Sequence, residues 1–351
     1  MGSGVFRFPR GMRKRWWMFR PIDWLCACLP RRRGGGLLLV RMDGIGDMAL
    51  FQPYVDAYRE ALGYSREQTT ILGCDSWRAL GPSLFPGYRL ETIAEKRFEK
   101  SFLYRLKVCL SLRCAGYDTA VASAFFRKVM LHDSLVLATG AAERIVARAT
   151  RSRRTQREFD WTEARMTRVI ATGEHPTHEI VRHRRFVEAA SGRPLPPVKL
   201  VDWPIREVPV ATDRPYAVLN FGSNEPGRNW PLDNYLDLGE RLLAAGVTPV
   251  FVGGARETPA KAKIAERFPD GRAVDLIGAT SLIGLIDVMR RAALTVSNET
   301  GPGHLAILVG TPTVMIYGGG HAGSFMTYPG APATRHAAVA HVPLECSHCL
   351  W

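Results

Sequence analysis

The chain has 351 residues, of which 46% are hydrophobic and 23% charged, and it carries a formal net charge of +14. This balance is typical of a globular protein with one large or two ordinary α/β domains, each able to bury a core. The seven cysteines are few for the length and odd in number, which excludes a secreted disulfide framework. We therefore expect a cytoplasmic protein.

Residues 1–35 form a basic and aromatic N-terminal extension. Residues 1–36 hold nine Lys or Arg against a single acidic residue, Asp23. The apolar run 24–29 is too short to span a bilayer, and it is also short for a signal sequence. Basic residues interleaved with Trp and Phe over residues 7–33 suit the anionic inner-membrane surface. A solvated tail and a nucleic-acid-binding segment are the alternatives, although the rest of the chain carries no nucleic-acid module.

Strands alternate with helices through the first half of the chain, which predicts a parallel sheet covered on both faces. The expected strands are 36–42, 69–73 and 119–123, and the expected helices are 48–62, 102–110 and 179–190. Residues 141–175 read as irregular and strongly basic. The proline-rich segment from residue 191 to about residue 209 is the best candidate for a linker.

A second alternating series follows this linker. The expected strands are 216–221, 248–254, 273–277, 292–296 and 313–317, and the expected helices are 234–245, 282–291 and 305–309. The fold class is therefore α/β with two halves. Because ligands bind beyond the carboxyl ends of parallel strands, we expect the site in a cleft between the halves.

Two carboxylates, Asp43 and Asp47, stand in the glycine-rich turn after the first strand. A carboxylate at the end of a strand is well placed to act as a general base. Asp47 also stands where a residue caps the helix that follows. The residues alone favour the cap.

The stretch 297–304 is a polar, glycine-rich turn between a strand and a short apolar helix. Pro302 suits the first helical turn, and Gly301 and Gly303 would let a ligand approach the backbone. The free N–H groups and the helix dipole favour an anion there. A phosphate site and an ordinary capped turn are about equally compatible with this segment alone.

Three loops in the second half follow strand ends, and together they favour ligand binding. They supply Ser223, Asn224 and Thr300 as hydroxyl and amide partners, Arg228 as a cation and Glu257 as an acceptor. A nucleoside diphosphate needs such a set, with N–H groups and a cation for phosphate and a carboxylate for ribose.

Several common motifs are missing from the sequence. It has no Asp-x-Asp, which argues against a metal held by paired carboxylates, and no Gly-x-x-x-x-Gly-Lys-Ser/Thr phosphate loop. No Gly-x-Gly-x-x-Gly follows the first strand of either half, so a dinucleotide cofactor is weakly supported, and a Gly-x-Ser-x-Gly elbow is also missing. Cys346 and Cys349 could bind zinc or cycle between redox states. A second cysteine pair is lacking, so a structural or remnant role is favoured.

These motifs, in this order, resemble the bacterial heptosyltransferases of glycosyltransferase family nine. The turn Asp43-Gly-Ile-Gly-Asp47, the Arg228-Asn-Trp-Pro231 loop, Gly253-Gly-Ala-Arg-Glu257 and Glu299-Thr-Gly-Pro-Gly-His304 carry the resemblance. It covers about nine-tenths of the chain, from residue 36 onward. It departs from the family pattern in having Arg228 where Lys is usual and Glu299 where Asp is usual.

The resemblance implies the GT-B architecture, with two Rossmann-like domains that face a central cleft. The first domain, residues 36–205, would bind the acceptor, and the second, residues 206–351, would bind the nucleotide-sugar donor. It implies an inverting, metal-independent glycosyltransferase that moves heptose from ADP-heptose onto the lipopolysaccharide core. Another nucleotide-sugar donor, or a non-catalytic binding protein of the same fold, is the alternative.

The resemblance also assigns roles to individual residues. Asp47 would be the catalytic base, and Arg151, Arg153 and Arg154 in the basic segment would suit an anionic acceptor. The donor would be held by Ser223, Asn224, Arg228, Glu257, Thr280, Glu299, Thr300, Gly301, Pro302, Gly303 and His304. No metal and no nucleic acid are expected, and we expect a monomer.

Overall fold

The protein forms two compact units, each built around its own sheet. The structure, a computed structural model, describes residues 13–30, 34–198, 201–204, 210–326, 328–329, 337–343, 345 and 347. Unit 1 takes the described residues within Met1–Asp43, Asp56–Glu174 and His183–Pro194. Unit 2 takes those within Gly44–Val55, His175–Arg182 and Leu195–Trp351. Two short segments from the first half of the chain thus belong to unit 2.

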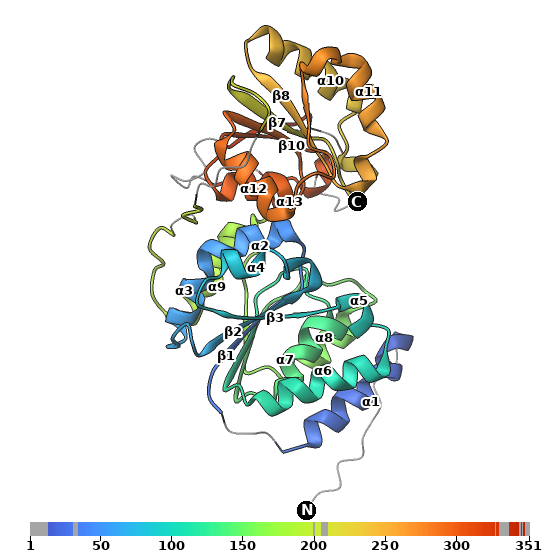
Figure 1. Cartoon of the computed structure of the whole chain (residues 1–351). Coiled ribbons are helices and arrows are strands. Elements are labelled where there is room, and N and C mark those ends of the chain that lie inside the picture. The colour runs from blue at the N-terminus through green and yellow to red at the C-terminus, as the bar shows by residue number, and fades with distance from the viewer. Residues whose placement is uncertain are drawn as a thin grey trace, which may run out of the picture. The chain divides into compact units, whose positions relative to one another are not determined.

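The sheet of unit 1 has six parallel strands in the order β3-β2-β1-β4-β5-β6 (Figure 1). Its strands are β1 (Leu37–Arg41), β2 (Thr69–Cys74), β3 (Arg89–Ile93), β4 (Thr119–Ala122), β5 (Glu143–Ala147) and β6 (Arg168–Ile170). The strands β1, β2 and β4 are buried along their whole length, as expected for parallel strands covered on both faces.

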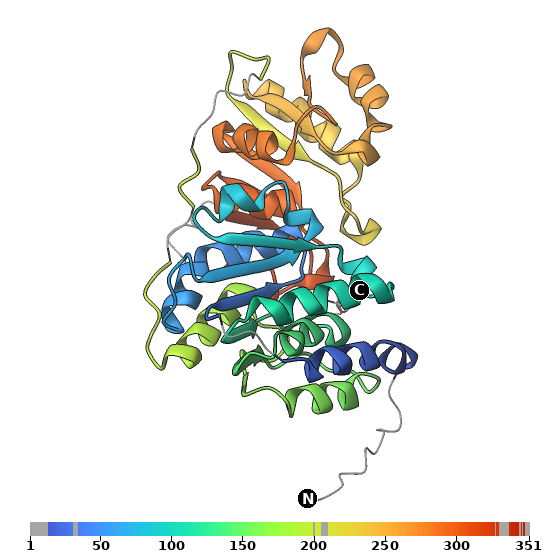
Figure 2. The same cartoon turned by 60° about the horizontal axis from the view of Figure 1, so that its bottom comes forward.

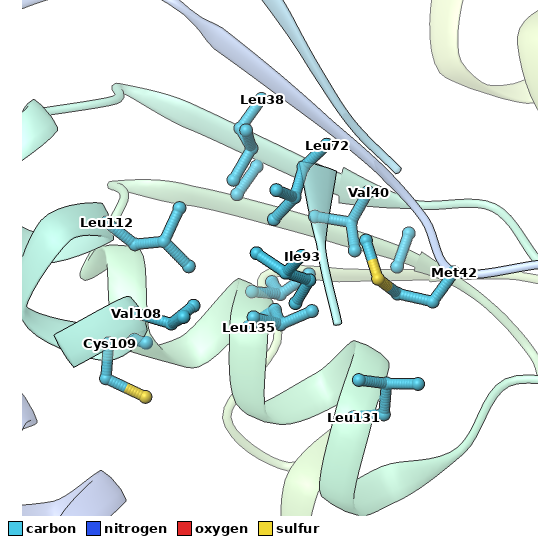
Figure 3. Packing of buried hydrophobic residues seen from close by; sticks show 14 of the residues in the cluster. Leu38, Val40, Met42, Leu72, Ile93, Val108, Cys109, Leu112, Leu131 and Leu135 are labelled. Carbon is cyan, nitrogen blue, oxygen red and sulfur yellow. The ribbon is translucent and has the colours of Figure 1, made fainter. Parts of the chain in front are cut away.

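Helices cover both faces of this sheet. They are α3 (Val55–Ala61), α4 (Gly81–Leu84), α5 (Glu95–Phe98), α6 (Phe102–Ala115), α7 (Ser134–Thr139), α8 (Gln156–Glu163) and α9 (Glu179–Ser191). Figure 3 shows the core on the α6 and α7 face, where Val108 and Leu135 pack toward Leu38, Val40 and Leu72. On the α3 and α9 face, the ring of Tyr58 lies 5.3 Å from that of Phe186.

The N-terminal helix α1 (Lys14–Cys28) packs beside α6 in unit 1 (Figures 1 and 2). The two helices run parallel, because Phe19 lies beside Phe102 and the Arg113 guanidinium reaches the Leu29 carbonyl oxygen. Between these contacts, buried Arg105 donates two hydrogen bonds of 2.7 Å to the carboxylate of Asp23. This charge-assisted, two-point contact fixes the register of α1 on α6.

The sheet of unit 2 repeats the same topology. Its parallel strands run in the order β12-β11-β10-β7-β8-β9. The strands are β7 (Tyr216–Asn220), β8 (Thr248–Val252), β9 (Val274–Asp275), β10 (Leu294–Asn298), β11 (Thr313–Ile316) and β12 (Ala337–Ala340). In both sheets the first strand of the unit pairs with its second and fourth strands, so the strand order reverses there.

The helices of unit 2 are α2 (Ile45–Phe51), α10 (Leu232–Ala244), α11 (Ala260–Arg267), α12 (Leu282–Arg291) and α13 (Gly301–Leu308). Figure 1 shows α10 and α11 on one face of the sheet and α12 and α13 on the other. Tyr235 of α10 and Phe268, just after α11, belong to a core with Leu219 and Phe251 of the strands. No described helix has both the length and the apolar character needed to cross a bilayer.

The alternation predicted from the sequence is confirmed in both halves, and one prediction is wrong. Residues 141–175 are not irregular, because they contain β5, α8 and β6. These strands lie toward the edge of the sheet, where side chains such as Arg144 and Arg168 keep partial exposure and interrupt the apolar pattern. The proposed domain boundary between residues 205 and 206 stays a prediction.

Candidate functional site

Two asparagines mark the point where the strand order of unit 2 reverses. Asn220 ends β7 and Asn298 ends the neighbouring β10, and both side chains are buried. The amide of Asn220 donates to Ser297 Oγ at 2.8 Å and to Thr300 Oγ1 at 3.0 Å. In open parallel sheets ligands bind outside the carboxyl ends of strands at such a reversal.

Asn298 joins the loop after β7 to the loop after β10. Its Nδ2 group donates to the Phe221 carbonyl at 2.6 Å, and its Oδ1 atom accepts from the Trp230 N–H at 3.1 Å and the Tyr235 hydroxyl at 3.0 Å. Because both its nitrogen and its oxygen bond to protein groups, the amide of Asn298 holds the two loops together rather than facing a ligand. It fixes the base of the loop that carries Arg228.

Arg228, Glu299 and His321 form one charged network. They stand in the loops after β7, β10 and β11, which are neighbouring strands. His321 Nδ1 lies 3.0 Å from Glu299 Oε2, and His321 Nε2 lies 3.3 Å from Arg228 Nη2. Arginine can only donate, so Nε2 accepts and the ring proton on Nδ1 is donated to the carboxylate.

Glu299 is therefore held by protein groups. Its side chain is buried, and Arg228 Nε lies 4.0 Å from its Oε2 atom. The sequence prediction placed Glu299 among the residues that hold the donor, and it did not foresee that His321 binds this carboxylate. Arg228 keeps a side-chain exposure of 23%, so it is the member of this network with the most access to solvent.

The helix α13 begins directly behind this network. Thr300 is its N-cap residue with extended backbone angles, and Pro302 stands in its first turn. The N–H groups of this turn and the helix dipole create a positive potential, which favours an anion. This part of the predicted cradle has the helix geometry that the sequence suggested.

Gly301 and Gly303 have a packing role that was not predicted. A Cβ atom at Gly303 would collide with the side chain of Met315 and would lie 2.9 Å from Ser297 Oγ. A Cβ atom at Gly301 would lie 3.2 Å from Ile45 Cβ. Both glycines therefore allow α13 to pack closely against β10, β11 and α2, and close approach of a ligand is not needed to explain them.

His304 is buried in the second turn of α13. Its Nδ1 atom lies 2.6 Å from the hydroxyl of Tyr328, whose ring also contacts His178 at 5.1 Å. Burial lowers the pKa of His304 to about 4, and the nearby Glu299 carboxylate only partly opposes this effect. Burial likewise lowers the pKa of His178 to about 4. Both imidazoles are neutral at pH 7.

Asp47 lies in the first turn of α2, within unit 2. The helix begins at Ile45 with Gly44 as its N-cap residue, so Asp47 is not the preceding cap residue that the sequence favoured. From the third helical position, its Oδ2 atom accepts the Gly44 N–H at 3.2 Å. The preceding residue, Gly46, packs against α13, because a Cβ atom there would lie 3.0 Å from His304 Cδ2. Asp47 is half-buried, and a cap in this position keeps its carboxylate charge stabilised by the helix dipole.

A pocket of about 370 Å³ lies in unit 2 next to the loop of Arg228, because Asn229 is part of its lining. Its lining includes Gly222, Ser223, Arg256 and Glu257, from the loops after β7 and β8. Glu257 accepts the Gly254 N–H at 2.7 Å, which holds its carboxylate at the pocket wall.

The two other predicted donor residues lie outside the lining of this pocket. Asn224 accepts a 2.7 Å hydrogen bond from Arg256 Nη1, which places it next to the pocket. Thr280 directly precedes Ser281, the N-cap residue of α12, and it does not line this pocket.

Unit 1 has a second ionic cluster at its own strand-order reversal. Asp43 Oδ2 lies 3.0 Å from Arg41 Nε, and Asp43 Oδ1 lies 3.7 Å from His132 Nε2. Although burial raises its pKa, Arg41 and His132 hold the pKa of the Asp43 carboxyl well below its usual range. Asp43 is thus a structural anion that ties the end of β1 to the segment before α7.

The predicted acceptor arginines lie in unit 1 and are not equivalent. Arg151 forms ion pairs with Asp160 and Glu163, so its charge is already neutralised by α8. Arg153 and Arg154 are exposed. The structure therefore gives Arg151 a role in holding α8, and the other two remain candidates for binding an anion.

Sequence reasoning missed His321 and Tyr328. His321 follows β11 in a Gly-Gly-Gly-His turn, which is the same strand–glycine–polar pattern that identified the other loops. Cys346 and Cys349 lie outside the described residues. Within the described part of the chain, no group of three or more His, Cys, Asp or Glu could hold a metal ion.

The family model of glycosyltransferase family 9 (heptosyltransferase) matches residues 146–350, which is more than half of the chain. The chain belongs to this family. It is also 29% identical over 96 residues to lipooligosaccharide heptosyltransferase 2 of Haemophilus influenzae. That stretch is 26% of this chain and 28% of the relative, so the match spans less than a third of the relative's length.

Solved structures of this family share the fold. The ADP-heptose lipopolysaccharide heptosyltransferase II of E. coli is 19% identical, with a TM-score of 0.65 and coverage of 89% of this chain and 92% of that chain. A family 9 glycosyltransferase from Veillonella parvula is 18% identical, with a TM-score of 0.69 and coverage of 89% and 87%. Heptosyltransferase WaaC of E. coli, solved with ADP, is 17% identical, with a TM-score of 0.62 and coverage of 88% and 93%. The fold is therefore that of the GT-B heptosyltransferases, with two parallel α/β units.

Proposed function

We propose that this family 9 chain transfers heptose from ADP-heptose to a lipopolysaccharide-core or related cell-surface glycan, with inversion and without a metal ion. The observation that carries the proposal is the network of Arg228, His321 and Glu299 beside the N-terminus of α13. It combines one accessible cation with helix N–H groups at the strand-order reversal of unit 2. Such a site suits a diphosphate.

The donor would occupy two neighbouring parts of unit 2. The diphosphate would lie at the first turn of α13 with Arg228 as its cation. The nucleoside would enter the pocket lined by Ser223 and Glu257, where the Glu257 carboxylate can accept hydrogen bonds from ribose hydroxyls. The leaving nucleoside diphosphate gains negative charge in the transition state, and fixed donors stabilise that charge without a metal.

Asp47 would remove the proton of the acceptor hydroxyl. It belongs to the segment that packs against α13, since Gly46 contacts His304 within unit 2. The oxygen of the acceptor would then attack the anomeric carbon from the face opposite the diphosphate, which inverts the configuration. Removal of a positioned general base typically costs about 10²- to 10⁴-fold in rate.

A thermal-shift screen of ADP-, GDP-, UDP- and dTDP-sugars tests the donor. We expect ADP-heptose to raise the melting temperature most, by an amount that follows its excess over Kd. A shift with UDP- or GDP-sugars and none with ADP-sugars would refute the heptose donor.

The variant Asp47→Asn tests the base. It keeps the side-chain oxygen that accepts the Gly44 N–H, so α2 remains capped. We expect transfer to fall at least 100-fold while the Kd for ADP-heptose stays within about twofold. Normal turnover by this variant would rule out Asp47 as the base.

A different donor sugar is the second candidate, and the binding of Glu299 by His321 favours it. Because the Glu299 carboxylate already accepts a hydrogen bond from His321, it can accept fewer hydrogen bonds from sugar hydroxyls than a free carboxylate can. The same screen separates the two candidates, because it compares the sugars directly. We further propose that the enzyme acts as a monomer on the cytoplasmic side, on a lipid-linked acceptor whose anionic groups would meet Arg153 and Arg154.

A further inference from the structure

Large apolar side chains are exposed along α1 and in the first turn of α6. They are Trp17, Met18, Trp24 and Leu25 on α1, with Phe102 and Leu103 on α6. Leu103 is 81% exposed and Leu25 is 52% exposed. Among the described residues, only Leu29, directly after α1, and Val342, in unit 2, are further large apolar side chains with such exposure. We call the six residues on α1 and α6 the apolar patch.

The outer face of α1 is apolar, which is unusual for a helix face that contacts water. Positions 17, 18, 21, 24, 25 and 28 follow the helical spacing of one face, and none of them is charged. The opposite face is also mostly apolar, with Trp16, Phe19 and Cys26 buried against unit 1. A surface helix normally carries polar residues on its outer side. With 15 residues, α1 is too short to span a bilayer.

The patch is continuous across two helices. Phe19 of α1 and Phe102 of α6 lie with their ring centroids 4.8 Å apart, so the exposed first turn of α6 borders on α1. The buried pair of Asp23 and Arg105 locks the two helices together. The patch is therefore a rigid feature of unit 1.

Basic side chains predominate around the patch. In residues 13–30 and 95–115, every charged side chain that is exposed is Lys or Arg. These include Lys14 and Arg15 at the start of α1, and Lys96, Arg97 and Lys100 just before Phe102. The acidic residues of both segments are buried or only partly exposed. An apolar surface bordered by basic residues complements an anionic lipid surface.

We propose that the apolar patch docks the protein on an anionic membrane surface, with α1 lying flat in the interface. The apolar side chains would enter the boundary between headgroups and acyl chains, and the Lys and Arg residues would contact the headgroups. A second copy of the chain is a poorer occupant, because pairing two such patches would bring like charges together. This proposal does not depend on which sugar or acceptor the enzyme uses.

Vesicle flotation with the full-length protein tests this docking. The probes are phosphatidylcholine vesicles and vesicles with 30% phosphatidylglycerol, in low and high salt. We expect the protein to float with the anionic vesicles, and the partition coefficient to fall at least tenfold for neutral vesicles and in high salt. The double variant Leu25→Gln/Leu103→Gln should lose at least tenfold in binding, since it removes one apolar side chain from each helix.

The matched control is Val342→Gln, which changes an equally exposed apolar residue in unit 2. We expect this variant to bind vesicles like the wild type, and circular dichroism melts should confirm that all variants are folded. Wild-type protein that stays with the aqueous phase, or a double variant that binds normally, would overturn the proposal. A wild-type dimer that becomes monomeric in the double variant, without vesicle binding, would instead assign the patch to a contact between chains.

Discussion

His321 joins the two charged side chains of the candidate donor site. Its ring donates to Glu299 and accepts from Arg228, so it sets the position of both. Among the described residues, no other side chain forms a hydrogen bond with the side chain of Arg228 or Glu299 that could replace the contact with His321. A hydrogen bond to a charged group is worth about 1.5–3 kcal/mol.

We therefore expect His321→Ala to weaken ADP binding by about 10- to 100-fold. His321→Asn should recover part of this loss, because its amide N–H can replace the Nδ1 donor to Glu299. Isothermal titration calorimetry with ADP measures both effects. His341→Ala is the control, because His341 stacks on Tyr317 outside this network, and its Kd should not change. Equal Kd values for His321→Ala and the wild type would show that the network does not position the cation.

The buried histidines make stability depend on pH. His178 and His304 have pKa values of about 4 in the folded protein, chiefly because of burial, against about 6.5 when unfolded. Between these values the unfolded chain binds more protons, so stability is complete above pH 6.5 and falls as the pH drops toward 4. Each histidine contributes a loss of order 3 kcal/mol across this window.

Urea unfolding at several pH values measures this loss. His304→Gln should reduce the slope between pH 6.5 and 4, since one of the two groups no longer titrates. His341→Gln should leave the slope unchanged, because His341 is only partly buried and stacks on Tyr317, away from this buried pair. If the stability of the wild type did not fall in this window, the two imidazoles could not be neutral and buried as described.

At the scale of elements, the packing of α13 against the sheet requires a residue without a side chain. A Cβ atom at Gly303 would collide with Met315 and approach Ser297 Oγ to 2.9 Å. Overpacking of this kind typically costs about 1–3 kcal/mol. We expect Gly303→Ala to be destabilised by this amount in urea unfolding.

Gly284 in α12 provides the matched control, because an added Cβ atom would lie 3.4 Å from its nearest neighbour, Ser281 Oγ. Alanine is a better helix former than glycine, so Gly284→Ala should be neutral or more stable by up to about 1 kcal/mol. Equal effects for the two variants would mean that α13 can shift to accept the extra methyl group.

The helices, strands and loops also show which features sequence patterns can predict. Buried strands such as β1 and β10 were predicted from the runs 36–42 and 292–296, which are rich in apolar and β-branched residues. The short strands β5 and β6 were not, because Arg144 and Arg168 interrupt the pattern at positions that the sheet edge leaves partly exposed. The loops of the donor site were found from their glycines and polar residues. The partner of Glu299 was not found, because His321 lies 22 positions away and only the parallel pairing of β10 and β11 brings it near.

At the scale of the whole molecule, the two units share one strand order but differ in the groups at the reversal point. Unit 1 has the closed ionic cluster of Arg41, Asp43 and His132, whereas unit 2 has Arg228 with access to solvent. We therefore expect ADP to bind unit 2. Hydrogen exchange with ADP should slow for amides in residues 221–231 and 298–304, and it should be unchanged for β2 and β3 of unit 1. Protection centred on residues 123–133 would contradict this assignment.

The parallel pairing of α1 with α6 has a consequence for synthesis of the chain. The α6 residues that cover the inner face of α1 lie about 80 positions later in the sequence, as with Asp23 and Arg105. At about 5–20 residues per second, the ribosome needs roughly 4–16 s to produce them. During that time both apolar faces of α1 are uncovered while the chain is still growing. The inner face of α1 thus stays uncovered until α6 has been made, so its apolar side chains can make other contacts before the fold exists.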